Sequence, residues 1–154
     1  MSMQMHVNKD MKKRNDTTVK AWVALVKAHS RALATIENSL KAAGMPTLEW
    51  YDALLELERA GNQGIRPVSL RAELLLPQYG MSRLVDRLEK AGYLKRTADQ
   101  KDGRGQRLFI TGRGKKTREK MWTVYAPAME EAVGGTLSQP ELRQLTGLLC
   151  KLEG

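Results

Sequence analysis

Polar and basic side chains mark one face of the segment between Pro77 and Gly92, and their chemistry suits contact with DNA. An arginine can form paired hydrogen bonds with a guanine edge, and a tyrosine or serine can contact a phosphate or a thymine methyl group. The residues that we predict to make such contacts are Gln78, Tyr79, Ser82, Arg83 and Arg87. Asp86 shares this face, and we expect it to orient an arginine because DNA would repel a carboxylate. The alternative is a solvated charged surface without a partner.

A second basic cluster lies a short way further along the chain. Arg104 stands between two glycines, which is typical of the tip of a hairpin. Narrow minor grooves attract inserted arginines because the negative potential of DNA is enhanced there. We therefore predict that Lys101, Arg104 and Arg107 contact DNA. The alternative is a flexible surface hairpin whose charge is incidental.

Other residue patterns do not favour catalysis, nucleotide binding or metal binding. Residues 114–116 read Gly-Lys-Lys, like the end of a phosphate-binding loop, but Phe109 occupies the place of the first glycine. Lys116 also replaces the Ser or Thr that would bind magnesium. The two histidines and the single cysteine are too few and too scattered for a metal centre. We expect no enzyme activity, no cofactor and no metal.

The first set of polar residues needs a helix to position it. The apolar residues that recur at helical spacing between them are Met81, Leu84, Val85 and Leu88. Pro77 suits the first helical position and Gly92 suits the residue past the last turn. A shorter helix, residues 68–76, precedes this one, and the sequence leaves room only for a tight turn between the two.

Short apolar segments on either side of the second basic cluster predict a two-stranded hairpin. Residues 93–96 are apolar and then basic, and residues 107–111 alternate as a strand does. Ile65 and Arg66 can add a short third strand beside them. Two helices joined by a turn, then a hairpin with a basic tip, form a winged helix-turn-helix. We place it at about residues 47–111, with a largely buried helix at 48–60 as its first element.

Long helices are expected on both sides of this lobe. One spans residues 17–43, and its apolar stripe is too long for a single small core to cover. Thr111 caps a second helix and Ser138 caps a third. We expect the helices at about residues 17–43 and 112–152 to form a dimerisation module, and residues 1–16 to form a flexible arm. The predicted fold class is mainly α with a small β-hairpin wing.

The charge and cysteine content narrow the range of partners and compartments. The formal net charge is +9, from 26 Lys and Arg against 17 acidic residues, which suits nucleic acid or an anionic membrane surface. The sequence contains no long apolar run and no signal-peptide pattern. A single cysteine, Cys150, excludes an internal disulfide, and we expect its side chain to be buried. We therefore expect a cytoplasmic protein that does not bind membranes.

The order of elements resembles the MarR family of bacterial transcription regulators. Residues 82–94 look like the family's recognition helix and its exit into the wing, and Asp102-Gly-Arg104 looks like its wing signature. The resemblance implies that Arg104 reaches the minor groove and that Asp102 forms a salt bridge that holds it. The chain departs from the family pattern at Gly103, where a second arginine is common, and at Arg71, where a small alanine is usual.

The resemblance also implies a small-molecule site. MarR-like proteins often bind aromatic or phenolic anions between the dimerisation helices and the DNA-binding lobe. The residues of this chain that are candidates for such a cleft are Trp22, His29, Trp50, Tyr51 and Trp122. For any one of these side chains, the alternative is packing in the core.

Together, these features predict a homodimeric, ligand-responsive repressor that binds a pseudo-palindromic operator in double-stranded DNA. Two alternatives keep the same fold. One is an architectural DNA-binding protein without a ligand, and the other is a protein–protein adaptor that has lost the DNA contacts. Basic residues on both the predicted helix and the predicted wing favour DNA over the adaptor.

Overall fold

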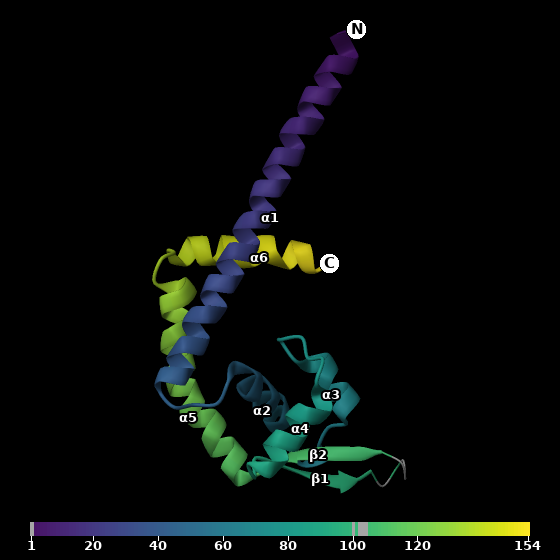
Figure 1. Ribbon diagram of the computed structural model, residues 1–154, viewed down its shortest axis with the longest axis vertical. Helices are drawn as coiled ribbons and strands as arrows, with labels where there is room; N and C mark the ends of the chain where they lie inside the picture. The colour runs from purple at the N-terminus through teal and green to yellow at the C-terminus, as the bar shows by residue number, and fades with distance from the viewer. Residues whose placement is uncertain (1, 100, 102–104) are drawn as a thin grey trace. The chain divides into compact units, whose positions relative to one another are not determined.

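The computed structural model describes residues 2–99, 101 and 105–154, with side chains from residue 15 onward. Two compact units are formed, one by Ile36–Glu130 and the other by the parts of the chain on either side of it. The central unit contains the elements of the predicted winged lobe (Figure 1). In chain order they are α2 (Leu48–Ala60), the 3-10 turn η1 (Gly61–Gln63), α3 (Pro67–Glu73), α4 (Met81–Lys90), β1 (Leu94–Ala98), β2 (Gln106–Ile110) and α5 (Gly112–Met129).

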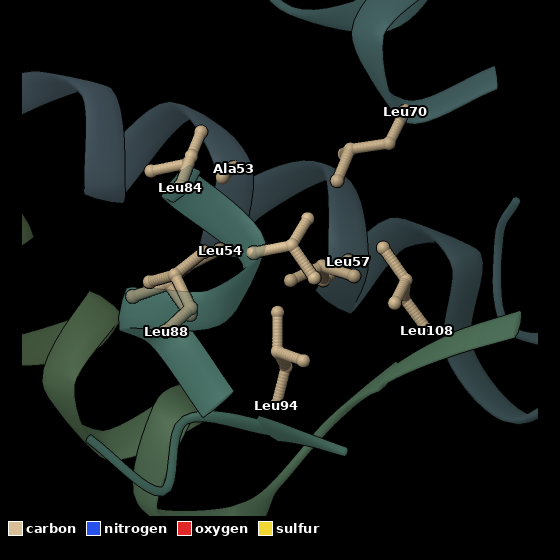
Figure 2. Close-up of a cluster of buried hydrophobic side chains, with 9 residues drawn as sticks. Ala53, Leu54, Leu57, Leu70, Leu84, Leu88, Leu94 and Leu108 are labelled. Atoms are coloured by element: carbon tan, nitrogen blue, oxygen red, sulfur yellow. The ribbon is translucent and has the colours of Figure 1, made fainter. Parts of the chain in front are cut away.

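The core of this unit lies where α2, α3, α4 and the hairpin meet (Figure 2). Helices α2 and α4 each contribute leucines at helical spacing, so a single apolar face of each points inward, and α3 contributes Leu70. The buried cluster consists of Ala53, Leu54, Leu57, Leu70, Leu84, Val85, Leu88, Leu94 and Leu108. Full burial of one leucine contributes about 1.5–3 kcal/mol, so this cluster holds α4 firmly against the lobe.

The wing is the antiparallel hairpin of β1 and β2, in which Leu94 pairs with Ile110 and Ala98 pairs with Gln106. Ile65 adds an isolated bridge to Leu108, with backbone hydrogen bonds of 3.0 and 2.9 Å. The predicted third strand of Ile65 and Arg66 is therefore present only as this bridge, because Arg66 is already the N-cap of α3. Gly64 before it has φ +65°, and a Cβ there would lie 2.7 Å from the Phe109 ring. Only glycine therefore allows this close approach.

The segment before α4 differs from the prediction. Pro77 does not begin the helix, which starts at Met81 with Gly80 as its N-cap. The connection between α3 and α4 therefore spans residues 74–80 and is longer than the tight turn that we predicted. The Leu76 N–H within it donates to the buried carboxylate of Asp52 on α2, at 2.8 Å. This contact with a residue distant in sequence holds the connection in a non-helical conformation, which local sequence signals do not reveal.

Helices also form the parts of the chain outside the winged lobe. Helix α1 (Ser2–Ala42) begins well before residue 17, so the segment that we predicted to be an arm is helical. Its Met, Lys and Arg residues are good helix formers, and no Gly or Pro interrupts it. A π-helical turn, η2 (Glu130–Gly134), follows α5, and α6 (Gln139–Glu153) begins with the predicted cap at Ser138.

Helix α6 exposes much of its surface. None of its residues is buried, and Leu145, Leu148 and Leu152 are exposed. Cys150 is exposed too, so the prediction that it is buried was wrong. The cysteine lies on the side of the helix away from the leucine stripe, because helical spacing places it nearly opposite Leu145 and Leu152.

Candidate nucleic-acid interface

The exposed face of α4 carries most of the polar residues that the sequence singled out. Ser82, Arg83 and Arg87 are exposed, while Leu84 between them is buried. Among the residues that the structure describes, none forms an ion pair with Arg83 or Arg87. These two guanidinium groups are therefore available to a partner outside the lobe.

A hollow of about 640 Å³ lies at the N-terminal end of α4, beside α3. Arg71, Tyr79, Ser82 and Arg83 line it, and the Tyr79 side chain is 94% exposed. Gly80 cannot cap the helix with a side chain, so the first backbone N–H groups of α4 lack a side-chain acceptor. Such a helix end favours anions, and the nearby arginines increase that preference.

Arg71 is the residue of this hollow that the sequence prediction missed. It lies on α3, whereas the predicted set came only from α4 and the hairpin. Its charge at a position where the family usually has alanine was a signal that pointed to it.

One arginine links α4 to the wing. The Arg96 guanidinium on β1 contacts the Asp86 carboxylate, and its Nε lies 3.1 Å from Oε2 of Glu89. The hydrogen bond to Asp86, with support from Glu89, raises the pKa of Arg96 despite partial burial. This confirms the prediction that Asp86 orients an arginine.

The open end of the wing is organised around Asp99. The Asp99 side chain is 2% exposed, and its Oδ2 lies 2.8 Å from Nε of Arg66 and 3.5 Å from Nε of Arg107. The Lys101 backbone N–H donates to Oδ1 at 3.1 Å. That hydrogen bond lowers the pKa of the Asp99 carboxyl, and Arg66 and Arg107 add to the effect while burial opposes it. Sequence reasoning did not identify Asp99.

The wing residues predicted from the sequence have different outcomes. Lys101 has an exposed side chain. Arg107 is partly exposed and also stabilises the fold, because its Nη1 donates to the carbonyl oxygens of Gln63 and Gly64 at 3.1 and 3.3 Å. Asp102 and Arg104, with their predicted salt bridge, lie outside the described residues.

Gln78 is not on the exposed face of the recognition helix, contrary to the prediction. It precedes α4 and is only 9% exposed. The prediction was wrong because it began the helix at Pro77, which would have placed Gln78 in its first turn.

Within the Ile36–Glu130 unit, the predicted ligand residues do not gather into one site. Tyr51 and Trp122 stack with ring centroids 6.2 Å apart, and Tyr125 packs edge-on against both. Trp50 instead packs against Tyr93 at 5.7 Å, next to the core. Trp22 is 64% exposed, and it lies with the exposed His29 in the other unit.

The part of the chain that the structure describes offers little else for chemistry. No group of three or more His, Cys, Asp or Glu residues in it is placed to hold a metal ion. No described helix combines the length and apolarity needed to cross a membrane.

A helix-turn-helix whose second helix is exposed beside a two-stranded hairpin defines the winged helix-turn-helix class. A model described as "MarR family" matches residues 43–105. Over 142 residues, 89% of each chain, the sequence is 31% identical to the uncharacterized HTH-type transcriptional regulator YkoM of Bacillus subtilis. The chain belongs to the MarR family of transcription regulators, which are not enzymes.

Solved structures share the fold. AbsC, a MarR family transcriptional regulator from Streptomyces coelicolor, is similar with a TM-score of 0.79 and 21% identity, over 90% of this chain and 93% of that one. A mutant of MarR from Escherichia coli, solved in complex with operator DNA, gives a TM-score of 0.77 and 20% identity, over 89% of this chain and 96% of that one.

Proposed function

We propose that the protein is a sequence-specific DNA-binding repressor that binds a pseudo-palindromic operator as a homodimer. The observation that carries this proposal is the exposed face of α4, where Arg83 and Arg87 have no ion-pair partner in the described chain. The net charge of +9 supplies long-range attraction to DNA. A protein of similar fold has been solved with operator DNA, which supports the proposal.

The proposed complex assigns different tasks to different residues. The N-terminal half of α4 enters the major groove, where Arg83 reads a guanine. Arg71, Ser82 and the free N–H groups at the start of α4 hold a phosphate. Lys101 and Arg104 bind DNA from the wing, with Arg104 in the minor groove.

The proposed regulator is a homodimer that responds to a small ligand. The two recognition helices of a dimer meet half-sites about one helical turn apart, roughly 10 base pairs centre to centre. A ligand that favours a different conformation of the lobe lowers DNA affinity and relieves repression. We expect these events to take place in the cytoplasm.

The test compares three variants on duplexes that the protein itself selects from a random library. Arg83→Ala is expected to cost roughly 1–3 kcal/mol of binding free energy and to relax the preference at one base pair of each half-site. Arg71→Ala is expected to weaken all sequences alike and to reduce the log–log salt slope by about 0.9 for each phosphate that is no longer neutralised. Arg143→Ala removes an exposed charge from α6 and serves as the control.

The outcome also separates the alternatives. Equal losses on every sequence for Arg83→Ala would assign that residue to the phosphate backbone. Failure of the wild-type protein to select any sequence, with salt-dependent binding to all duplexes, would indicate an architectural protein. Absence of DNA binding at low salt would contradict the proposal and favour the adaptor.

A further inference from the structure

A cleft of about 390 Å³ lies within the Ile36–Glu130 unit, between α2, α5 and the connection from α3 to α4. Its volume falls within the range of small-molecule sites, about 300–1,000 Å³. Residues from all three elements line it, among them Tyr51, Leu76 and Trp122. The chemistry of this lining indicates what it binds.

One wall of the cleft is aromatic. Tyr51, Trp122 and Tyr125 pack against one another with centroids 4.9–6.2 Å apart, and Trp122 remains 45% exposed. Aromatic faces bind flat apolar groups, and their electron-rich surfaces attract cations.

The ionisable groups of the cleft are mainly acidic. Three carboxylates line it, from Asp52, Glu56 and Glu73, against one guanidinium, from Arg59, for a formal charge of −2. Arg59 is occupied, because its Nη1 lies 2.7 Å from Oε1 of Glu56. This pairing leaves the other two carboxylates uncompensated, although the chain as a whole carries +9.

Asp52 is the central acidic group. The residue is only 7% exposed, and its Oδ2 accepts the Leu76 N–H at 2.8 Å. Its Oδ1 accepts no hydrogen bond from a described residue. Because no fully buried side-chain oxygen in the described chain lacks a partner, Oδ1 must retain accessible surface.

Burial raises the pKa of the neighbouring Tyr125 hydroxyl, and repulsion from Tyr51 and Asp52 adds to the effect. Burial and these neighbours together therefore disfavour a negative charge at Tyr125.

We propose that this cleft binds a small aromatic cation, an aryl group bearing a protonated amine or a quaternary ammonium. The aryl group packs on Trp122 and Tyr51, and the cation faces Asp52. An aromatic anion, the ligand class that the family resemblance implied, would enter a site of formal charge −2 without a free cationic partner. The proposal rests on the proposed function, because it names the ligand class of the regulator.

The position of the cleft links ligand binding to the DNA-binding face. The Leu76 N–H bond to Asp52 ties the α3–α4 connection to α2, and this connection leads directly into α4. A cation bound at Asp52 competes with the Leu76 N–H for the same carboxylate and weakens that hydrogen bond. The start of α4, with Arg83, and Tyr79 just before it then change position.

The test uses two probes of the same shape and opposite charge, 1-naphthylmethylammonium and 1-naphthoate. Isothermal titration calorimetry on the full chain at constant ionic strength measures both affinities. We expect the cation to bind at least roughly tenfold more tightly, the size of one charge-assisted hydrogen bond. Saturation with the cation should also weaken binding to the selected duplex, while tetramethylammonium at equal concentration should not.

Two variants and a control locate the site. Asp52→Asn keeps an acceptor for the Leu76 N–H but removes the charge, so it should abolish the preference for the cation. Trp122→Leu should weaken binding of the cation and leave the fold intact, since that side chain is half-exposed. Glu119→Gln removes an exposed carboxylate of α5 outside the cleft and should change neither affinity. Circular dichroism melts confirm that each variant folds.

Each outcome decides between the two claims. Binding of neither probe at millimolar concentration, tighter binding of naphthoate, or an unchanged preference in Asp52→Asn overturns the assignment of a cation. DNA selection by the unliganded protein is measured separately, so the proposed function can stand when the ligand assignment fails. Cation binding without DNA binding would leave the cleft assigned and refute the regulator.

Discussion

The arginines of the winged lobe fall into two groups. Members of the first group form ion pairs with carboxylates inside the lobe, and they are Arg59, Arg66, Arg96, Arg107 and Arg118. Members of the second have no ion pair with any described residue, and they are Arg71, Arg83, Arg87 and Arg113. The same side-chain type therefore stabilises the lobe at some positions and is presented to a partner at others.

Arg107 tests this division. Its guanidinium binds two backbone carbonyl oxygens and lies near Asp99, so Arg107→Ala should lower the free energy of unfolding by about 1–3 kcal/mol. Lys101→Ala removes a charge from the same hairpin, but its side chain is exposed, and stability should change by less than about 0.5 kcal/mol. Urea unfolding of both variants measures the difference. Equal stabilities of the two variants would contradict the structural role given to Arg107.

The sequence could predict which side of α4 is exposed, because the apolar positions define the buried side. It could not predict that Arg107 turns inward. That orientation depends on Gln63 and Gly64, whose carbonyl oxygens are brought to β2 only by the folded chain. Asp99 was missed for the same reason, since two of its partners come from η1–α3 and β2.

At the scale of elements, the carboxylate of Asp99 holds the open end of the wing together, and it does so in its ionised form. The pKa of Asp99 is lowered in the folded protein, so the unfolded chain binds its proton more readily. The contribution of Asp99 to stability is therefore fully present above its unfolded pKa of about 3.9 and is lost as pH falls through the lower folded pKa. Thermal melts of wild type and Asp99→Asn between pH 7 and pH 3 should show a gap that narrows only below about pH 4–5.

The control for this pH dependence is Glu119→Gln. It removes an exposed carboxylate that forms no ion pair with a described residue, so its melting curves should parallel those of wild type. A gap for Asp99→Asn that widens toward acid would reverse the sign and refute the role given to this carboxyl.

Elements were predictable where local signals agreed with tertiary contacts. The bounds of α2, the cap at Ser138 and the bridge at Ile65 followed from apolar spacing, capping chemistry and alternation. The start of α4 was mispredicted because Pro77 fits both a helix start and a loop. The hydrogen bond from the Leu76 N–H to Asp52 stabilises the loop conformation.

The aromatic cleft shows the same limit. Adjacent residues of a helix point about 100° apart, so Trp50 and Tyr51 cannot share a wall. The sequence grouped them because both are aromatic. In the structure, Trp50 packs against Tyr93 and Tyr51 stacks on Trp122.

At the scale of the whole molecule, the exposed leucines of α6 bear on assembly. Leu145, Leu148 and Leu152 form an apolar stripe that no part of the described chain buries. We expect light scattering at micromolar concentration to give twice the 17.3 kDa mass of one chain. Leu148→Glu places a charge in the stripe and should shift the protein toward monomer, because burial of an unpaired carboxylate costs several kcal/mol.

Arg143→Gln provides the matched control for assembly. It changes the charge by the same amount on the opposite side of α6 and should leave the dimer intact. A monomeric wild-type protein, or equal effects of the two substitutions, would remove α6 from the proposed interface.

The contact of Arg96 with Asp86 and Glu89 has a consequence for the operator. It fixes the wing to α4, so the distance between the two DNA-contacting elements is set when the protein folds. In the proposed complex the duplex must therefore deform to fit that distance, by narrowing a groove or opening a base step. The energy needed to deform the duplex differs between A-tracts and flexible pyrimidine–purine steps. Base pairs that no side chain touches then contribute to selectivity through their stiffness.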